Sequence, residues 1–79
     1  MILSGIGTKI IDIGSPSSDI SVEECSVWVG GDGNVCVDSA AGQIKKTFYG
    51  AKAGTVIPCR IVKVYGGTNT TATNMLGVA

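Results

Sequence analysis

The chain has 79 residues, enough for one small domain, and 44% of them are hydrophobic while 15% are charged. This composition is too apolar and too weakly charged for a disordered chain, and the apolar stretches are too short and interrupted for a membrane span. Six Lys and Arg balance six Asp and Glu, which argues against nucleic acid as a partner, because phosphate binding needs a concentrated positive surface.

The residue types favour strands. Val, Ile and Thr together supply 25 residues, whereas the chain has only two Leu. Branched side chains suit a pleated sheet, and the twelve Gly suit the turns between short strands. No stretch repeats apolar residues at helical spacing. The sequence therefore predicts an all-β fold, a small antiparallel β-barrel or sandwich of about five to seven short strands with an N-terminal extension.

The N-terminal residues 1–24 are predicted to form a unit of their own, and residues 25–79 a compact antiparallel β-domain. Turn-forming residues over 14–19, with Pro16 among them, predict a Ser/Pro hinge. The isoleucines before this hinge have too few local partners to form a core. Two alternatives follow: a first strand folded back onto the same barrel, or an arm that adds to the sheet edge of a neighbouring subunit.

Two valine-rich segments, 27–29 and 35–37, flank a glycine-rich turn and predict a β-hairpin. A three-residue turn at 31–33 would gather four valines on one face, with Trp28 beside Cys36 on the other. A two-residue turn would move the second strand by one residue and break up this valine face. We favour the first register because it collects all four valines on one side.

Three further strands are expected along the rest of the chain. They cover residues 43–49, 56–65 and 73–78. The second of these is the longest, and its apolar alternation changes phase at Ile61 and Val62. Such a change predicts a bulge or a sharp bend at this point.

The chain offers little chemistry for catalysis. It has no His, the side chain whose ordinary pKa lies near neutrality. Its three cysteines, Cys25, Cys36 and Cys59, lack the CxxC spacing, and residues 1–14 lack a signal-peptide pattern, so we expect free thiols in a reducing cytosol. Nothing in the sequence orients a base that could activate a Cys or Ser nucleophile. We therefore expect no enzyme activity, no cofactor and no metal site.

Five motifs follow one another from Ser15 onward. They are 15–19 (SPSSD), 27–33 (VWVGGDG), 53–58 (AGTVIP), 60–64 (RIVKV) and 67–74 (GTNTTATN). Each alone is ordinary turn or strand chemistry, but the series spans about four fifths of the chain. In its order it resembles the small head spike-base protein family of gene transfer agents and related tailed bacteriophages.

This resemblance implies a non-enzymatic virion structural protein, either a capsid decoration (cement) protein or a head spike-base subunit. It would act through oligomeric β-interfaces on the capsid surface of the virion, after synthesis in the bacterial host cytoplasm. The implied partners are further copies of the chain and the major capsid or fibre proteins, with neither nucleic acid nor membrane. A small, neutral chain without catalytic groups fits a symmetric homo-oligomer. The candidate interface residues are Ile10, Ile11, Ile13, Trp28, Tyr49 and Tyr65.

An alternative is a small β-barrel binding module for carbohydrate or single-stranded nucleic acid. Aromatic side chains interleaved with cations are typical of single-strand binding surfaces. The side chains that could form such a surface are Lys45, Lys46, Tyr49, Lys52, Arg60, Lys63 and Tyr65. The six acidic residues elsewhere in the chain offset these cations, so we rank the structural protein first.

Overall fold

Six β-strands make up most of residues 8–79, the part of the chain that this computed structural model describes. The strands are β1 (Ile10–Gly14), β2 (Ile20–Trp28), β3 (Gly33–Ser39), β4 (Lys46–Ala51), β5 (Ile61–Val64) and β6 (Met75–Val78), with the 3-10 helix η1 (Gly67–Asn69) before β6. The predicted all-β fold is confirmed. The described residues contain no helix that is long and apolar enough to cross a membrane.

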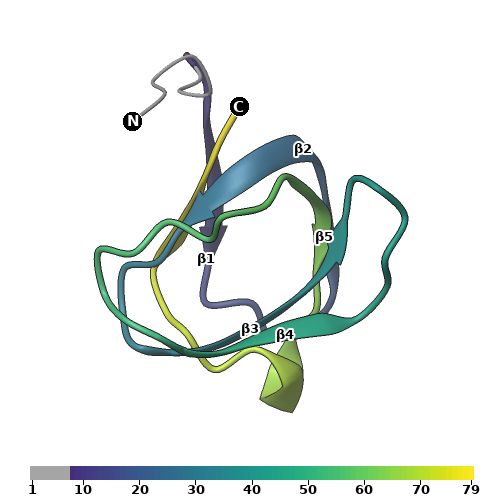
Figure 1. Cartoon of the computed structure of the whole chain (residues 1–79). Helices are drawn as coiled ribbons and strands as arrows, with labels where there is room; N and C mark the ends of the chain where they lie inside the picture. The colour runs from purple at the N-terminus through teal and green to yellow at the C-terminus, as the bar shows by residue number, and fades with distance from the viewer. Residues whose placement is uncertain (1–7) are drawn as a thin grey trace.

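The strands form one antiparallel sheet in the order β1-β6-β2-β5-β3-β4. The sheet is open, with β1 and β4 at its two edges, and it curls strongly around its interior (Figure 1). Both terminal parts of the described chain lie together, because β1 pairs with β6 (purple and yellow in Figure 1). The two ends of the described chain therefore lie side by side, with β1 at the edge of the sheet and β6 next to it.

The irregular segment between β5 and β6 lies along the same side of β3 as β5 and completes this curl. Tyr65 donates its N–H to the carbonyl of Cys36 at 2.8 Å, and Thr71 donates to the carbonyl of Asn34 at 2.9 Å. The hydroxyl of Thr70 accepts a hydrogen bond from the N–H of Cys36 at 3.0 Å. A side chain here takes the place of a backbone partner, so β3 remains satisfied where the ladder is irregular.

The predicted hairpin is wrong in its pairing, because β5 lies between β2 and β3. The end of β2 pairs instead with residues 54–57, and the N–H of Ile57 donates to the carbonyl of Val27 at 2.8 Å. A glycine-rich turn reverses the chain, but it does not decide which strand becomes the neighbour. Here a segment more than twenty residues further along the chain occupies that position.

The predicted valine face is nevertheless correct. All four valines of the two segments are at most 1% exposed and belong to one core. The alternation of buried and exposed residues along a strand puts every second side chain on the inner face. The core residues are Ile13, Cys25, Val27, Val29, Val35, Val37, Ala51, Ile57, Ile61, Val64, Ala72 and Met75.

The phase change expected at Ile61 and Val62 is confirmed as a register shift in β5. Lys63 pairs with Asp38, but the next pair joins Ile61 to Ser39, so Val62 is an extra residue opposite β3. Both Ile61 and Val64 are buried although they lie three positions apart. A bulge of this kind bends the strand and increases its twist, which helps the sheet to curl.

Other strand boundaries differ from those expected. The expected strands 43–49, 56–65 and 73–78 correspond to shorter strands that begin at Lys46, Ile61 and Met75. The expected division between residues 24 and 25 falls inside β2, which begins at Ile20. Residues 10–14 form a strand of the same sheet, as in the first of the two alternatives, whereas residues 1–7 of the expected extension lie outside the described residues.

Candidate interaction surface

The alternation of β1 separates the three isoleucines that the sequence singled out. Ile13 is only 5% exposed and belongs to the core, and Ile11 packs against that core. Ile10 lies on the opposite face of the strand and is 72% exposed. Only Ile10 of the three is therefore free to contact another molecule.

Strand β6 extends the exposed face of β1. Val78 pairs with Ile10, and Leu76 pairs with Asp12, so these side chains share the outer face of the sheet. Gly77, between the two apolar residues, is buried on the inner face. Neither Leu76 nor Val78 is among the hydrophobic residues that pack against the core.

Trp28 at the end of β2 continues the same row of side chains. It pairs with Leu76 on one side and forms an isolated bridge with Val56 on the other. Trp28 is 37% exposed and Val56 is 54% exposed. We call the resulting patch the outer apolar face and define it as Ile10, Trp28, Val56, Leu76 and Val78.

The outer apolar face adjoins an open sheet edge. Lys9 and Ala79 exchange both of their backbone hydrogen bonds, at 3.0 and 2.9 Å. In an antiparallel ladder the next residue along the strand directs its N–H and C=O away from that partner. Ile10 thus directs its backbone groups toward the open edge, where β1 has no strand partner among residues 8–79.

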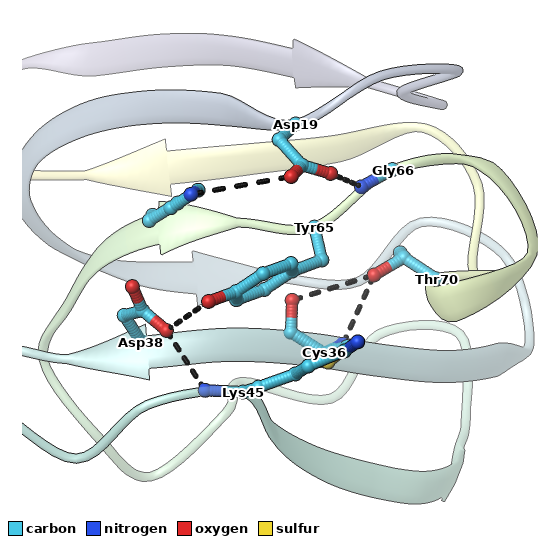
Figure 2. A network of polar contacts seen from close by, with 8 residues as sticks. Asp19, Cys36, Asp38, Lys45, Tyr65, Gly66 and Thr70 are labelled. Atoms are coloured by element: carbon cyan, nitrogen blue, oxygen red, sulfur yellow. Dashed lines mark hydrogen bonds and ion pairs between the residues drawn. The ribbon is translucent and has the colours of Figure 1, made fainter.

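Tyr65 lies in a network of polar contacts and is only partly exposed. Its hydroxyl donates a hydrogen bond to Asp38 Oδ1 at 2.8 Å, and Lys45 donates its backbone N–H to the same oxygen at 2.8 Å (Figure 2). The ammonium of Lys63 lies 4.8 Å from the centroid of the ring and 3.9 Å from Asp19 Oδ2. These contacts hold the ring within a polar network that joins β3, β5 and the loop before β2.

The network shifts the pKa of both of its central groups. The hydrogen bond from the Lys45 N–H lowers the pKa of Asp38 below its ordinary value of 3.8, assisted by Tyr65 and Lys63. The hydrogen bond to Asp38 raises the pKa of Tyr65 to about 12. Tyr65 is therefore a firmly held donor over the ordinary pH range.

Tyr49 and Ile44 are exposed at the other end of the strand order. Tyr49 is 80% exposed and lies on the edge strand β4, and Ile44 is exposed in the loop that precedes this strand. In the sheet order β4 is the strand furthest from β1. Tyr49 is therefore accessible, as expected of an interface residue, but it is not part of the outer apolar face.

Three of the five cations expected to form a basic surface, Lys52, Arg60 and Lys63, lie close to acidic partners. Arg60 donates to Glu24 Oε2 at 2.8 Å and to the carbonyl of Glu24 at 3.0 Å. The other pairs are Lys9 with Glu23, Lys52 with Asp32, and Lys63 with Asp19. Alternating charges of this kind do not give the continuous positive groove that tracks a nucleic-acid backbone.

The cysteines are free and mostly inaccessible. Cys25 and Cys36 are buried, and burial raises the pKa of the Cys25 thiol, which keeps it in the unreactive protonated form. Cys59 is half-buried, and its thiol contacts the carbonyl of Arg60 at 3.4 Å. Within residues 8–79, no three His, Cys, Asp or Glu side chains are grouped so that they could hold a metal ion.

The structure brings together two of the six predicted interface residues, Ile10 and Trp28, through β6. The other members of the outer apolar face, Val56, Leu76 and Val78, were not among the candidates. The alternation of Leu76, Gly77 and Val78 could have indicated a strand with an apolar outer face. Their proximity to Ile10 depends on the pairing of the first and last strands, which no local pattern encodes.

A comparison of the chain with protein families, with curated proteins and with solved structures finds no match.

Proposed function

We propose that the chain is a virion structural protein, a capsid decoration or head spike-base subunit. It acts at the capsid surface through contacts with further copies of itself and with major capsid or fibre proteins. The observation that carries this proposal is the outer apolar face beside the open edge of β1. The resemblance carried by the order of the five sequence motifs supports the class of particle.

The outer apolar face favours association for a simple physical reason. Apolar surface is more stable when it is removed from water, by about 25 cal/mol for each Å² buried. Single exposed apolar side chains are normal, but a contiguous group of five, rimmed by polar residues, is typical of a contact site. Trp28 lies within this group, and tryptophan is among the residues that most often dominate binding energy.

Several polar side chains of the described chain hold the fold together. Asp32 accepts a hydrogen bond from the N–H of Ala53 at 2.7 Å, and the side chain of Asn34 accepts one from Gly50 at 3.0 Å. Asp38 Oδ1 likewise accepts hydrogen bonds from the Tyr65 hydroxyl and the Lys45 N–H. This arrangement supports a role in which surface contacts, rather than a reactive group, carry the function.

The test is the composition of particles from the bacterium or phage that encodes the chain. Quantitative mass spectrometry of purified particles should recover the chain at a fixed ratio to the major capsid protein. The substitution Ile10→Asp should lower that ratio at least tenfold, because it places a charge on the contact surface. Ile44→Asp is the matched control, since Ile44 is 67% exposed but lies outside the outer apolar face.

Particles that lack the chain, or that retain Ile10→Asp at the wild-type ratio, would contradict the proposal. Thermal unfolding of both purified variants serves as the folding control. Because both side chains are exposed, both substitutions should leave the cooperative transition in place.

A further inference from the structure

The outer apolar face extends across four neighbouring chain segments, from Ile10 on β1 to Val56 beside β2. Neighbouring strands lie about 4.8 Å apart, so the face is roughly 14 Å wide. Nothing among residues 8–79 covers it, since Ile10, Trp28 and Val56 all remain exposed. A segment that covers the whole face would have to be apolar and at least this long.

Residues 1–7 have these properties. Their sequence, MILSGIG, contains four large apolar side chains (Met1, Ile2, Leu3 and Ile6) and no charged side chain. Seven extended residues span about 23 Å, which exceeds the width of the face. They join the described chain at Thr8, next to the Lys9–Ala79 pair that ends the sheet. The face and the segment therefore match in chemistry and in length.

The direction of β1 decides which copy is covered. Along β1 the chain runs from Thr8 past Ile10 toward Asp12, and Asp12 is level with Leu76 and Trp28. Residues 1–7 precede Thr8, so they would have to reverse direction at once to return over their own Trp28. A second copy beside the sheet can be reached without this reversal. The geometry thus favours exchange between copies.

We propose that residues 1–7 of each chain pack on the outer apolar face of a second copy. This inference rests on the self-association in the proposed function and assigns its two contacting surfaces. Exchange of identical segments produces a closed symmetric assembly in which every copy both gives and receives a segment. The contact buries Trp28, which is the only Trp of the chain and therefore reports on it directly.

The test uses the full chain, a chain lacking residues 2–7, and the full-length variant Leu3→Asp. The molar mass of each is measured by sedimentation, and the exposure of Trp28 by acrylamide quenching, over a hundredfold range of protein concentration. The full chain should form oligomers, and its quenching constant should fall at least threefold as they form. The truncated chain and Leu3→Asp should stay monomeric, with Trp28 quenched equally at every concentration.

A peptide of residues 1–7 provides the complementary arm. Added to the truncated chain, it should restore the protection of Trp28, whereas the same peptide with Leu3→Asp should not. Oligomers of the truncated chain with protected Trp28 would overturn the proposal, because another surface would then cover the face. Concentration-independent protection in a monomeric full chain would also overturn it, since the segment would then cover its own copy.

The outcome is separable from that of the proposed function. Recovery of the truncated chain in particles at the wild-type ratio, together with its monomeric state in solution, would leave the virion role intact without the exchanged segment. Concentration-dependent protection of Trp28 in a chain that is missing from particles would support the exchange and contradict the virion role.

Discussion

Gly66 lies so close to the backbone of Ser18 that a Cβ atom at this position would overlap it. The neighbouring atoms are main chain, so they cannot move aside as the end of a flexible side chain would. We expect Gly66→Ala to lower the free energy of unfolding by about 3 kcal/mol, because the segments on both sides must separate. Urea denaturation measures the loss.

Gly42 is the matched control for this substitution. Its φ of +93° is unfavourable for alanine, but nothing lies within 4 Å of a Cβ atom there. Gly42→Ala should therefore cost only about 1 kcal/mol. Equal losses for the two variants would show that backbone conformation, and not the approach of Ser18, sets the cost at Gly66.

The pair of Tyr65 and Asp38 should be visible in a spectroscopic titration. In a Tyr49→Phe background Tyr65 is the only tyrosine, so the absorbance of tyrosinate reports on it alone. Its pKa should be about 12, because ionisation breaks the hydrogen bond to Asp38 and places two negative charges together. Adding Asp38→Ala should move the pKa toward the ordinary 10.0. An unchanged titration would mean that Asp38 does not hold the hydroxyl.

The same pair predicts how stability depends on pH. The folded chain holds Tyr65 protonated up to about pH 12, so this contribution is complete below pH 10.0 and is lost as the pH rises from there to about 12. Asp38 has a lowered pKa, so its contribution is complete above pH 3.8 and is lost as the pH falls below that value. The Tm measured by thermal unfolding should therefore depend less on pH in Asp38→Ala, at both the acid and the alkaline end of the range. Lys52→Ala should retain the wild-type dependence of Tm on pH.

The strand β1 contains its own test of the alternation that places it in the sheet. Ile13→Ala should lower the free energy of unfolding by about 3 kcal/mol, because it opens a cavity in the core. Ile10→Ala removes the same atoms from a side chain that is exposed in the single chain, so at protein concentrations low enough to keep the chain monomeric it should cost less than about 0.5 kcal/mol. Equally small losses for both variants in urea denaturation would mean that both side chains are in solvent. Residues 10–14 would then form a detached arm and not a strand of the sheet.

Thr70 shows how a side chain can complete a strand. Its buried hydroxyl accepts from the N–H of Cys36 at 3.0 Å, between the parts of β3 that pair with backbone. Thr70→Val keeps the shape but leaves this N–H buried without a partner, so it should cost about 2 kcal/mol in urea denaturation. Thr70→Ser keeps the hydroxyl and should cost about half as much or less. A larger loss of unfolding free energy in Thr70→Ser than in Thr70→Val would contradict the role of the hydrogen bond.

At the element scale, the sequence reveals which face of a strand is buried better than it reveals which strand lies beside it. The four core valines and the bulge at Val62 follow from local alternation, and both are confirmed. The hairpin of β2 and β3 is wrong because β5, far away in the sequence, provides the neighbour. Strand β5 begins only at Ile61, after an irregular stretch. The branched residues over 56–65 predict one continuous strand and give no sign of this later start.

The interaction surface has the same limit. Ile10 and Trp28 could be selected as exposed apolar side chains, but their common face depends on the pairing of β6 with both β1 and β2. Tyr65 could not be separated from them by residue type. Its partner Asp38 lies 27 positions away, and only the β3–β5 ladder brings the two together.

The whole molecule has an interior that is small for independent stability. A chain of this length buries only about 60% of its unfolded surface, and such domains commonly gain stability from disulfides, metals or association. All three cysteines are free, and the outer apolar face is available for association. We therefore expect folding and association to be coupled, so that stability depends on protein concentration.

This coupling predicts a midpoint of thermal unfolding that rises with concentration. For a dimer of 79-residue chains, each tenfold increase adds about 1.4 kcal/mol and should raise Tm by about 4 °C. Scanning calorimetry over a roughly hundredfold range of protein concentration, from about 10 μM to about 1 mM, would measure this change of Tm with concentration. Ile10→Asp should have a lower and constant Tm, while Ile44→Asp should keep the wild-type slope. A wild-type Tm independent of concentration would mean that the small core suffices by itself, and that the outer apolar face stays in water at no cost to the fold.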